Sequence, residues 1–373
     1  MLKSFQSRLV WPPVTTFQAF GQTYALPFRG TVSNCERLPL PLLRYLAGFL
    51  DGDGCVSAVG QSCSLSASQS ASGAEVLYLL ATTLGGTVYV HARGHGLGQP
   101  SLQWIIRGHA AQKAACQLAP ESVVKHQQLI LAASWPSEDR LRLDAKQRLA
   151  SLNSLSQYDT SHVSCSWAYI AGFFDAEGCI RACHDRVSVR MSLVQKNKDV
   201  LGWIDRFWRA DLGLSSSWVV HKKSSVTEIT VNRHSNTHLL MRRLLDNGLL
   251  LKQQQAFLGL SLRDVYYPDF RETMSSLSGN QARYQRLAED GCIRATAIIA
   301  IRKRIRRCEA LGRHEEVARL QQQLREMQQQ HRVVAIFVTS PEEADEAAAN
   351  KEGPLQGPVG LSDSLTGQGR VGA

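Results

Sequence analysis

The chain has 373 residues, of which 44% are hydrophobic and 20% charged, and this is enough for two ordinary domains with cores of their own. No apolar run reaches the length of about 18 residues that a membrane span requires, so a transmembrane protein is excluded. The formal net charge of +10 indicates a polyanionic partner, most often nucleic acid, although a basic soluble protein has the same balance. The nine cysteines form no C-x-x-C pair, so they indicate neither a disulfide framework nor a zinc ribbon.

Residues 1–37 are expected to be a leader, because the first 35 contain no acid, as in a transit peptide. A first unit is expected over residues 38–134. Its first helix begins near Pro41 and ends at Gly54. A strand at 62–68 follows, in which apolar residues alternate with serines, so it is buried on one face. The remaining elements are a helix at 74–84, strands at 88–93 and 102–107, and a closing helix at 122–133.

A linker with a short helix is expected over residues 135–163, and a second unit over 164–275 repeats the same order. Ser164 or Ser166 caps its first helix, which Gly178 ends. A strand at 187–193 again alternates apolar and polar residues. The rest of the unit is a helix at 200–212, strands at 218–223 and 227–232, and a helix at 238–262.

The C-terminal part has a different composition. Residues 276–331 are expected to be a basic helical extension, with one long helix over 295–330 that contains Arg302-Lys-Arg-Ile-Arg-Arg307. Such a run is more often a solvated face than a binding site. Residues 332–373, rich in Glu, Ala, Gly and Pro, are expected to be a disordered acidic tail.

An internal repeat sets the architecture. The motif Leu46-Ala-Gly-Phe-Leu-Asp-Gly-Asp-Gly54 recurs 124 residues later as Ile170-Ala-Gly-Phe-Phe-Asp-Ala-Glu-Gly178. Two further pairs of segments keep the same order, 68–70 with 194–196 and 125–129 with 252–256. These landmarks predict an α+β fold of two pseudo-symmetric αββαββα units, each with a four-stranded antiparallel sheet and helices on one face.

The repeated motif places an acid at the C-terminal end of each helix, Asp53 and Glu177. The small pairs Ala47-Gly48 and Ala171-Gly172 let two such helices approach closely, so we expect the motif helices to pack against each other. Neighbouring carboxylates repel unless a cation neutralises them, and Mg²⁺ prefers carboxylate, water and phosphate oxygens. Isolated acids are most often structural, but this pair beside a basic sheet indicates metal-dependent phosphodiester hydrolysis.

With these residues, the two copies resemble the LAGLIDADG homing endonuclease family in its single-chain, double-motif form. The resemblance covers about residues 38–262. It implies a DNA-binding saddle made by the two sheets, and a monomeric endodeoxyribonuclease that cuts both strands of a long asymmetric duplex site with Mg²⁺. It also implies an intron-encoded protein of an organelle, more often of a chloroplast than of a mitochondrion.

The resemblance also implies roles for the matching residues. Asp53 and Glu177 would bind metal, together with the backbone carbonyls of Gly52 and Ala176. The polar residues that end the second strands would order water at the active site, and two late lysines would lie near the scissile phosphates. These four residues are Gln69, Gln195, Lys125 and Lys252. The earlier motif acids, Asp51 and Asp175, would be structural.

The open sheet faces of such a saddle would contact DNA. Strand alternation from the motif acids predicts which side chains face the groove, although a polar face is also what any solvated sheet shows. The predicted DNA-binding residues are Ser57, Ser64, Ser66, His91, Arg93, Gln103, Arg107, Arg181, Arg190, Ser192, His221, Lys223, Thr230 and Asn232. The many serines of the first unit predict looser base reading in its half-site.

Two other functions are compatible with the sequence. Some members of the family act as RNA maturases that help their group I intron fold, and a basic C-terminal helix suits intron RNA binding. A non-catalytic DNA-binding regulator on the same fold would have lost one or both motif acids, and this chain keeps both.

Overall fold

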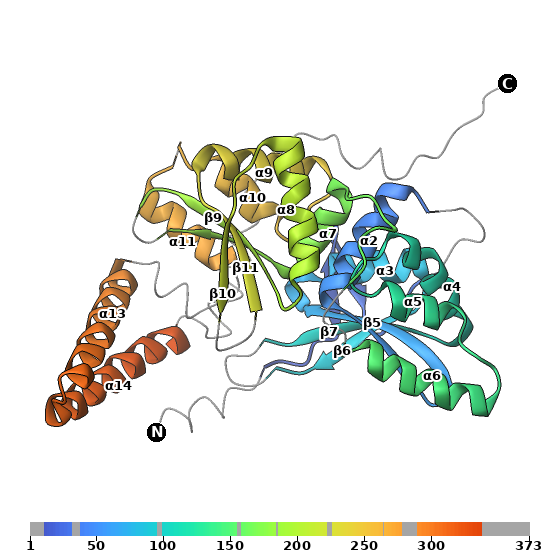
Figure 1. Cartoon of the computed structure of the whole chain (residues 1–373), viewed down its shortest axis with the longest axis horizontal. Helices are drawn as coiled ribbons and strands as arrows, with labels where there is room; N and C mark the ends of the chain where they lie inside the picture. Colours follow the sequence, from blue (N-terminus) through green and yellow to red (C-terminus); the bar gives the residue numbers. More distant parts are fainter. Residues whose placement is uncertain are drawn as a thin grey trace.

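The computed structural model describes residues 11–31, 38–94, 99–154, 158–183, 186–221, 226–263, 265–277 and 289–337. Two α+β units lie side by side, and a pair of helices near the C-terminus lies to one side of them (Figure 1). One hydrophobic core runs through both units. Within the described residues, no helix combines the length and the hydropathy that crossing a membrane demands.

The first unit begins with the motif helix α2 (Leu40–Asp53), which runs directly into the first strand of its sheet. The other elements follow in the predicted order, with the additional helix α4. They are β4 (Gly54–Val59), β5 (Ser62–Ser70), η1 (Ala71–Gly73), α3 (Glu75–Leu84), β6 (Thr87–Ala92), β7 (Ser101–Arg107), α4 (Gly108–Leu118), η2 (Ala119–Glu121) and α5 (His126–Ala133), and α6 (Asp139–Leu152) follows in the linker.

The second unit repeats this order from the motif helix α7 (Trp167–Glu177) onward. The prediction of one helix over residues 238–262 is wrong: the chain forms two helices there, and Gly248, with a φ of +90°, lies in the turn between them. The remaining elements are β8 (Gly178–Ala182), β9 (Val189–Gln195), α8 (Lys198–Leu212), β10 (Ser217–His221), β11 (Val226–Val231), α9 (His234–Asp246), α10 (Gln253–Leu260) and α11 (Tyr267–Leu277).

Both sheets are antiparallel, and the helices of the two units lie on the same side of them (Figure 1). The strand order is β10-β11-β9-β8 in the second unit and β3-β6-β7-β5-β4 in the first. The α+β class and the two related units are therefore confirmed. The first sheet differs from the prediction in having a fifth strand, β3 (Phe28–Arg29), which pairs with the outer edge of β6.

The segment expected to be a leader contributes structure to the first unit. Strands β1 (Thr16–Ala19) and β2 (Gln22–Ala25) form a hairpin, and Phe17 in β1 is buried in the main core. The ring of Tyr78 on α3 contacts the rings of Tyr24 and Phe28. Burial of these aromatic rings holds residues 16–29 on the first unit.

The motif helices begin and end through local features of their sequence. Ser166 caps α7 by accepting a hydrogen bond from the Tyr169 backbone N–H at 3.3 Å, which decides between the two predicted caps. Helix α2 has no side-chain cap, and Pro41 lies in its first turn. Gly54 and Gly178 follow the last helical residues and turn the chain into β4 and β8. Each acid is therefore the last residue of its helix.

The two motif helices cross with their backbones in direct contact. A Cβ atom on Gly48 would overlap the carbonyl oxygen of Tyr169, and one on Gly172 would overlap that of Tyr45. Further along the crossing, Gly52 leaves the space that the side chain of Ala176 fills. Glycine is therefore required at both crossing points, because the neighbouring atoms are backbone and cannot move aside.

The C-terminal extension is a helical hairpin and not the single long helix that was predicted. Helices α13 (Glu289–Ala310) and α14 (His314–Phe337) are joined by a short turn in which Gly312 has a φ of +67°. A small core of Ile305, Cys308 and Leu320 holds them together. Helix α14 also continues six residues into the predicted tail; residues 338–373 lie outside the described part of the chain.

The crossing predicts the effect of adding one methyl group. Gly48→Ala should lower the free energy of unfolding by more than about 3 kcal/mol, because overpacking against backbone cannot relax. Gly202→Ala on α8 is the matched control, since a Cβ there meets only ordinary contacts, the nearest at 3.6 Å. It should stabilise by about 0.5–1 kcal/mol through helix propensity. Urea unfolding followed by circular dichroism measures both, and equal stabilities would contradict the backbone contact.

Candidate active site at the paired helix ends

The acids of the two motifs meet at the end of the helix crossing. Asp53 ends α2 and Glu177 ends α7, and the Cγ atom of Glu177 lies against Gly52, the residue before Asp53. The electrostatic effect of Asp53 contributes to the raised pKa of Glu177, second to burial. The structure therefore brings together two carboxylates that are separated by 124 positions in the sequence.

Each acid accepts a hydrogen bond from one of the two glutamines that were predicted to order water at the site. The side-chain amide of Gln69, on β5, donates to Asp53 Oδ2 at 2.5 Å. The amide of Gln195, at the end of β9, donates to Glu177 Oε1 at 3.0 Å. In the described part of the chain these are the hydrogen bonds that the two carboxylates accept, so other lone pairs remain for a cation or for water.

A lysine lies beside each acid. Lys125 Nζ donates to the backbone carbonyl of Asp51 at 2.6 Å, and Lys252 Nζ donates to that of Asp175. Burial lowers the pKa of both lysines, while Asp53 and Glu177, together with Asp51 or Asp175, oppose that change. Both ammonium groups thus lie within electrostatic reach of both acids.

Asp51 and Asp175 position these lysines. The Asp51 carboxylate accepts hydrogen bonds from the Ser122 hydroxyl at 2.5 Å and from three consecutive backbone N–H groups, those of Val123, Val124 and Lys125, at 2.7–3.0 Å. Asp175 accepts from the backbone of Leu250 at 2.7 Å and Lys252 at 3.0 Å. Both side chains are buried, so their structural role agrees with the prediction.

Two tyrosines connect the units through the same carboxylates. Tyr45 on α2 donates its hydroxyl to Asp175 at 2.8 Å, and Tyr169 on α7 donates to Asp51 at 2.7 Å. Burial raises the pKa of both phenols, so they remain protonated donors. Tyr45 and Tyr169 were not predicted from the sequence, although their spacing of 124 positions is that of the motif repeat and is a usable signal.

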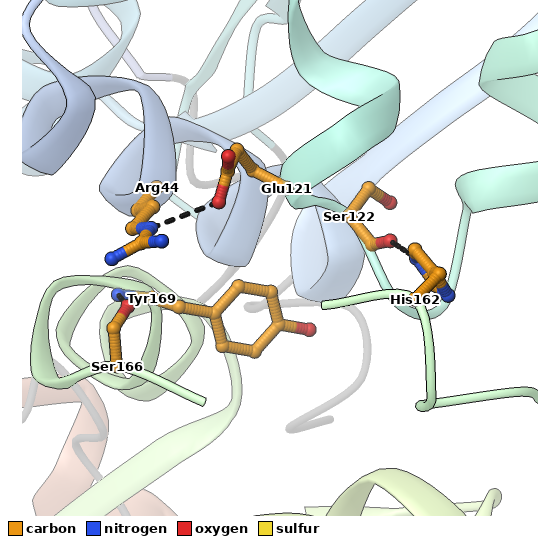
Figure 2. Close-up of polar contacts among 6 residues, drawn as sticks. All are labelled: Arg44, Glu121, Ser122, His162, Ser166 and Tyr169. Atoms are coloured by element: carbon orange, nitrogen blue, oxygen red, sulfur yellow. Dashed lines mark hydrogen bonds and ion pairs between the residues drawn. The ribbon is translucent and has the colours of Figure 1, made fainter. Parts of the chain in front are cut away.

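The loop that carries Lys125 is also fixed to the first motif helix and to the linker (Figure 2). Arg44 on α2 forms an ion pair with Glu121 at 2.9 Å, and His162 from the linker lies 2.8 Å from the Ser122 carbonyl oxygen through Nε2. The His162 ring also stacks on His126. The linker therefore contributes to the position of Lys125.

The site fits a hard divalent cation. Burial raises the pKa of Asp53, against the lowering effect of both lysines, and burial and Asp53 raise that of Glu177. A bound cation would relieve both effects. Among the described residues, no group of three or more His, Cys, Asp or Glu side chains forms a metal cluster. Two carboxylates completed by water, phosphate and the backbone carbonyls predicted at Gly52 and Ala176 suit Mg²⁺, which keeps several waters.

The strand register decides which predicted DNA-binding residues share the open faces. In the first sheet, Ser57 lies opposite Ser64, and Ser64 opposite Arg107, while Gln103 lies opposite Ser68. In the second sheet the corresponding residues surround the central strand β9; they are Arg181, Arg190, Ser192, Thr230 and Asn232. These side chains lie on the faces that were predicted for them.

Several of these predictions need correction. Ser64, Ser66, Ser192 and Thr230 are buried, with Ser64 only 1% exposed, because strands flank them on both sides. They form the floor of each face and are not free contacts. A bulge between Val90 and Ala92 puts Ala92 opposite Ser101, so alternation fails at His91, and Arg93 lies beyond the strand. Lys223 lies outside the described residues.

Fold and site together define a duplicated α+β protein with one carboxylate from each unit at a shared helix crossing. No protein-family model matches the sequence, and a search of curated proteins gives no match.

Solved structures similar to this chain include the LAGLIDADG meganuclease I-AabMI bound to uncleaved DNA, with 15% identity and a TM-score of 0.46 over 66% of this chain and 98% of that one. I-SmaMI, bound to an uncleaved DNA target in the presence of calcium ions, has 11% identity and a TM-score of 0.44 over 64% and 97%. The LAGLIDADG homing endonuclease I-GzeII in complex with its DNA target has 11% identity and a TM-score of 0.42 over 64% and 97%.

The raised pKa of Glu177 predicts how stability depends on pH. The pKa of Glu177 in the folded protein lies above its ordinary value, so the folded protein holds this proton more tightly than the unfolded chain does. The free energy of unfolding of the metal-free protein therefore falls as pH rises from the ordinary pKa to the folded-state pKa, and the full loss is present above the folded-state pKa. Glu177→Gln keeps the acceptor for Gln195 and removes the charge. It should raise the melting temperature by about 2–4 °C at pH 8 and have little effect near pH 4.

Scanning calorimetry of metal-free protein at both pH values tests this prediction. Glu138→Gln, at an exposed position before α6, is the control and should change neither value. Added Mg²⁺ should stabilise the parent more than Glu177→Gln. If Glu177→Gln melts at a lower temperature than the parent at pH 8, the ionised Glu177 carboxylate does not destabilise the folded protein.

Proposed function

We propose that this chain is a site-specific endodeoxyribonuclease of the LAGLIDADG type that cuts both strands of duplex DNA with a divalent cation. One observation supports it above all others: Asp53 and Glu177 converge from two related helices, each accepts a hydrogen bond from its own glutamine, and two buried lysines lie within electrostatic reach of both acids. The structural role in each motif is already filled by Asp51 and Asp175, whose oxygens accept backbone hydrogen bonds, so Asp53 and Glu177 are not needed for it.

The residues of the site divide the chemistry between them. Asp53 and Glu177 would hold Mg²⁺, which when bound supplies an activated water and neutralises phosphate charge. Gln69 and Gln195 fix one oxygen of each carboxylate and leave the remaining lone pairs for ligands. Lys125 and Lys252 place positive charge where the negative charge of the pentacoordinate phosphate develops.

The duplicated fold suits a duplex substrate. The backbones of the two DNA strands are related by local two-fold axes, and the two units have the same element order and make reciprocal contacts at the helix crossing. One unit can therefore serve each strand, and one chain supplies both acids, so we propose a monomer. The sequences of the two open faces differ, which favours an asymmetric target. The family resemblance supports an intron-encoded role in an organelle, with chloroplast ahead of mitochondrion.

A second candidate function, intron RNA binding as a maturase, is favoured by the surface of α13. Arg302, Lys303, Arg306 and Arg307 are exposed on this helix, and their spacing puts them on one side of it. Ile305 and Cys308 face α14, and Arg304 is paired with Glu316 at 2.6 Å. The four cations form a stripe that suits the phosphates of a nucleic acid.

The cleavage reaction tests the first proposal. A cleavable site is first selected from a randomised duplex library with the parent protein and Mg²⁺. Asp53→Asn should then abolish double-strand cleavage of this site, a fall of more than about 100-fold, while the dissociation constant changes less than about threefold, because the lost charge binds metal and not phosphate. Asp144→Asn, on the exposed side of α6, should cleave like the parent. Cleavage retained by Asp53→Asn would show that the wrong acid has been assigned.

Replacing the four cations of α13 by glutamine tests the second candidate. Splicing of the cognate intron should be lost and the salt dependence of RNA binding should become shallower, while DNA cleavage is retained. The control removes Arg140, Lys146 and Arg148 from α6, which also carries exposed cations. An equal loss in both variants, or no loss in either, contradicts an RNA-binding role of α13.

A further inference from the structure

An acid lies on the open sheet face of the second unit, which was predicted to contact DNA. Glu228 on β11 is opposite Val194 of β9 and Val219 of β10, on the same face as Arg181, Arg190 and Ser192. Its side chain is 14% exposed, so the carboxylate reaches the surface of this face. Next to a DNA backbone it would repel phosphate, and its presence therefore requires another explanation.

The carboxylate of Glu228 bridges two residues that were predicted to contact DNA. Arg181 Nη2 lies 3.5 Å from Oε1, and His221 Nε2 lies 2.9 Å from Oε2. Burial favours the protonated acid, but the hydrogen bonds from His221 and Ser192 and the charge of Arg181 outweigh it and lower the pKa of Glu228. At neutral pH the group is a carboxylate that fixes the position of Arg181, whose side chain is still 34% exposed.

The first unit has a neutral residue at the equivalent place. Gln103 on β7 lies opposite Ser68 of β5 and Tyr89 of β6, as Glu228 lies opposite the matching residues of the second sheet. The Tyr89 hydroxyl donates a hydrogen bond to the Gln103 side chain. The two units thus share one position on their open faces, with an amide in the first and a charged pair in the second.

Arg181 presents hydrogen-bond donors next to the acceptor oxygens of Glu228. This arrangement of donors beside an acceptor is complementary to the major-groove edge of one kind of base pair. In the major groove a G·C pair displays two acceptors on guanine, N7 and O6, and then the N4 donor of cytosine. Arginine bonds guanine through both acceptors, and glutamate accepts from cytosine N4. An A·T pair opposes this arrangement, because the adenine N6 donor would face the guanidinium.

We infer that Arg181 and Glu228 together read a G·C base pair in the half-site bound by the second unit, with guanine on the Arg181 side. This inference rests on the proposed endonuclease function. Glu228 acts in two ways: it accepts from cytosine, and it prevents Arg181 from binding a backbone phosphate instead of a base. Both effects increase sequence discrimination and not general affinity for DNA.

Reciprocal substitutions at the two equivalent positions test the inference. The parent first selects its cleavable site from a randomised duplex library, and every single base-pair change in both half-sites is then profiled. Glu228→Gln should reduce the G·C preference at one position of the second half-site by about 5- to 150-fold, because it no longer holds Arg181 for the bidentate contact with guanine, which carries about that discrimination. It should also steepen the salt dependence of binding, because Arg181 is released to phosphate. Gln103→Glu should alter preference only in the first half-site.

A second substitution guards against a folding defect in the first. Arg181→Lys keeps the charge but loses the two-donor contact with guanine, so it should weaken the same G·C preference at the same position. Glu138→Gln, outside both sheets, should leave every preference unchanged.

The outcomes separate the two levels of the proposal. A parent protein that cleaves no duplex in the library overturns the endonuclease function itself. A parent that cleaves, with Glu228→Gln and Arg181→Lys variants that lower cleavage of all sites equally or change no position, overturns the base-reading role alone.

Discussion

The close approach of α2 and α7 is the contact on which the rest of the structure depends. Gly48 and Gly172 let each helix touch the backbone of the other, and this sets the distance between the two units. Because Asp53 and Glu177 are the last residues of these helices, the same contact fixes the separation of the two acids. The same helix contact therefore determines both the packing of the core and the geometry of the candidate active site.

The acids inside the crossing extend this constraint to the lysines. Asp51 and Asp175 each organise the loop that delivers a lysine, and each also accepts a hydroxyl from a tyrosine of the other unit. Loss of one hydrogen-bond donor to either buried carboxylate would strongly destabilise the folded protein, because a buried polar group would then be left without its partner. A separation of the units would disturb both lysine loops at once, which couples the docking of the units to the chemistry of the site.

Duplication has produced two units that are alike in the site and different in the faces beside it. Gly52 and Ala176 differ because only one side of the crossing has room for a methyl group. The acids and their glutamines and lysines are matched in both halves. On the open faces, by contrast, Gln103 in one unit stands where Glu228 stands in the other. Apart from Gly52/Ala176 and the exchange of Asp53 for Glu177, these differences between the two units lie on the open sheet faces.

The sequence by itself determined the duplication, the α+β class and the motif helices with their two acids, because these follow from local periodicity and from spacings that recur. The roles of the two glutamines and two lysines are what the family resemblance implies for matching positions. Only the tertiary structure decided that Tyr45 and Tyr169 cross between the units, that the bulge at His91 changes which side chains face outward, and that Phe17, Tyr24 and Phe28 anchor an apparent leader. The tertiary structure also revealed the role of Glu228. Strand alternation predicts which face a residue lies on, but it does not predict that Arg181 and His221 on neighbouring strands pair with this carboxylate. These features depend on contacts between segments far apart in the chain, which no local pattern encodes.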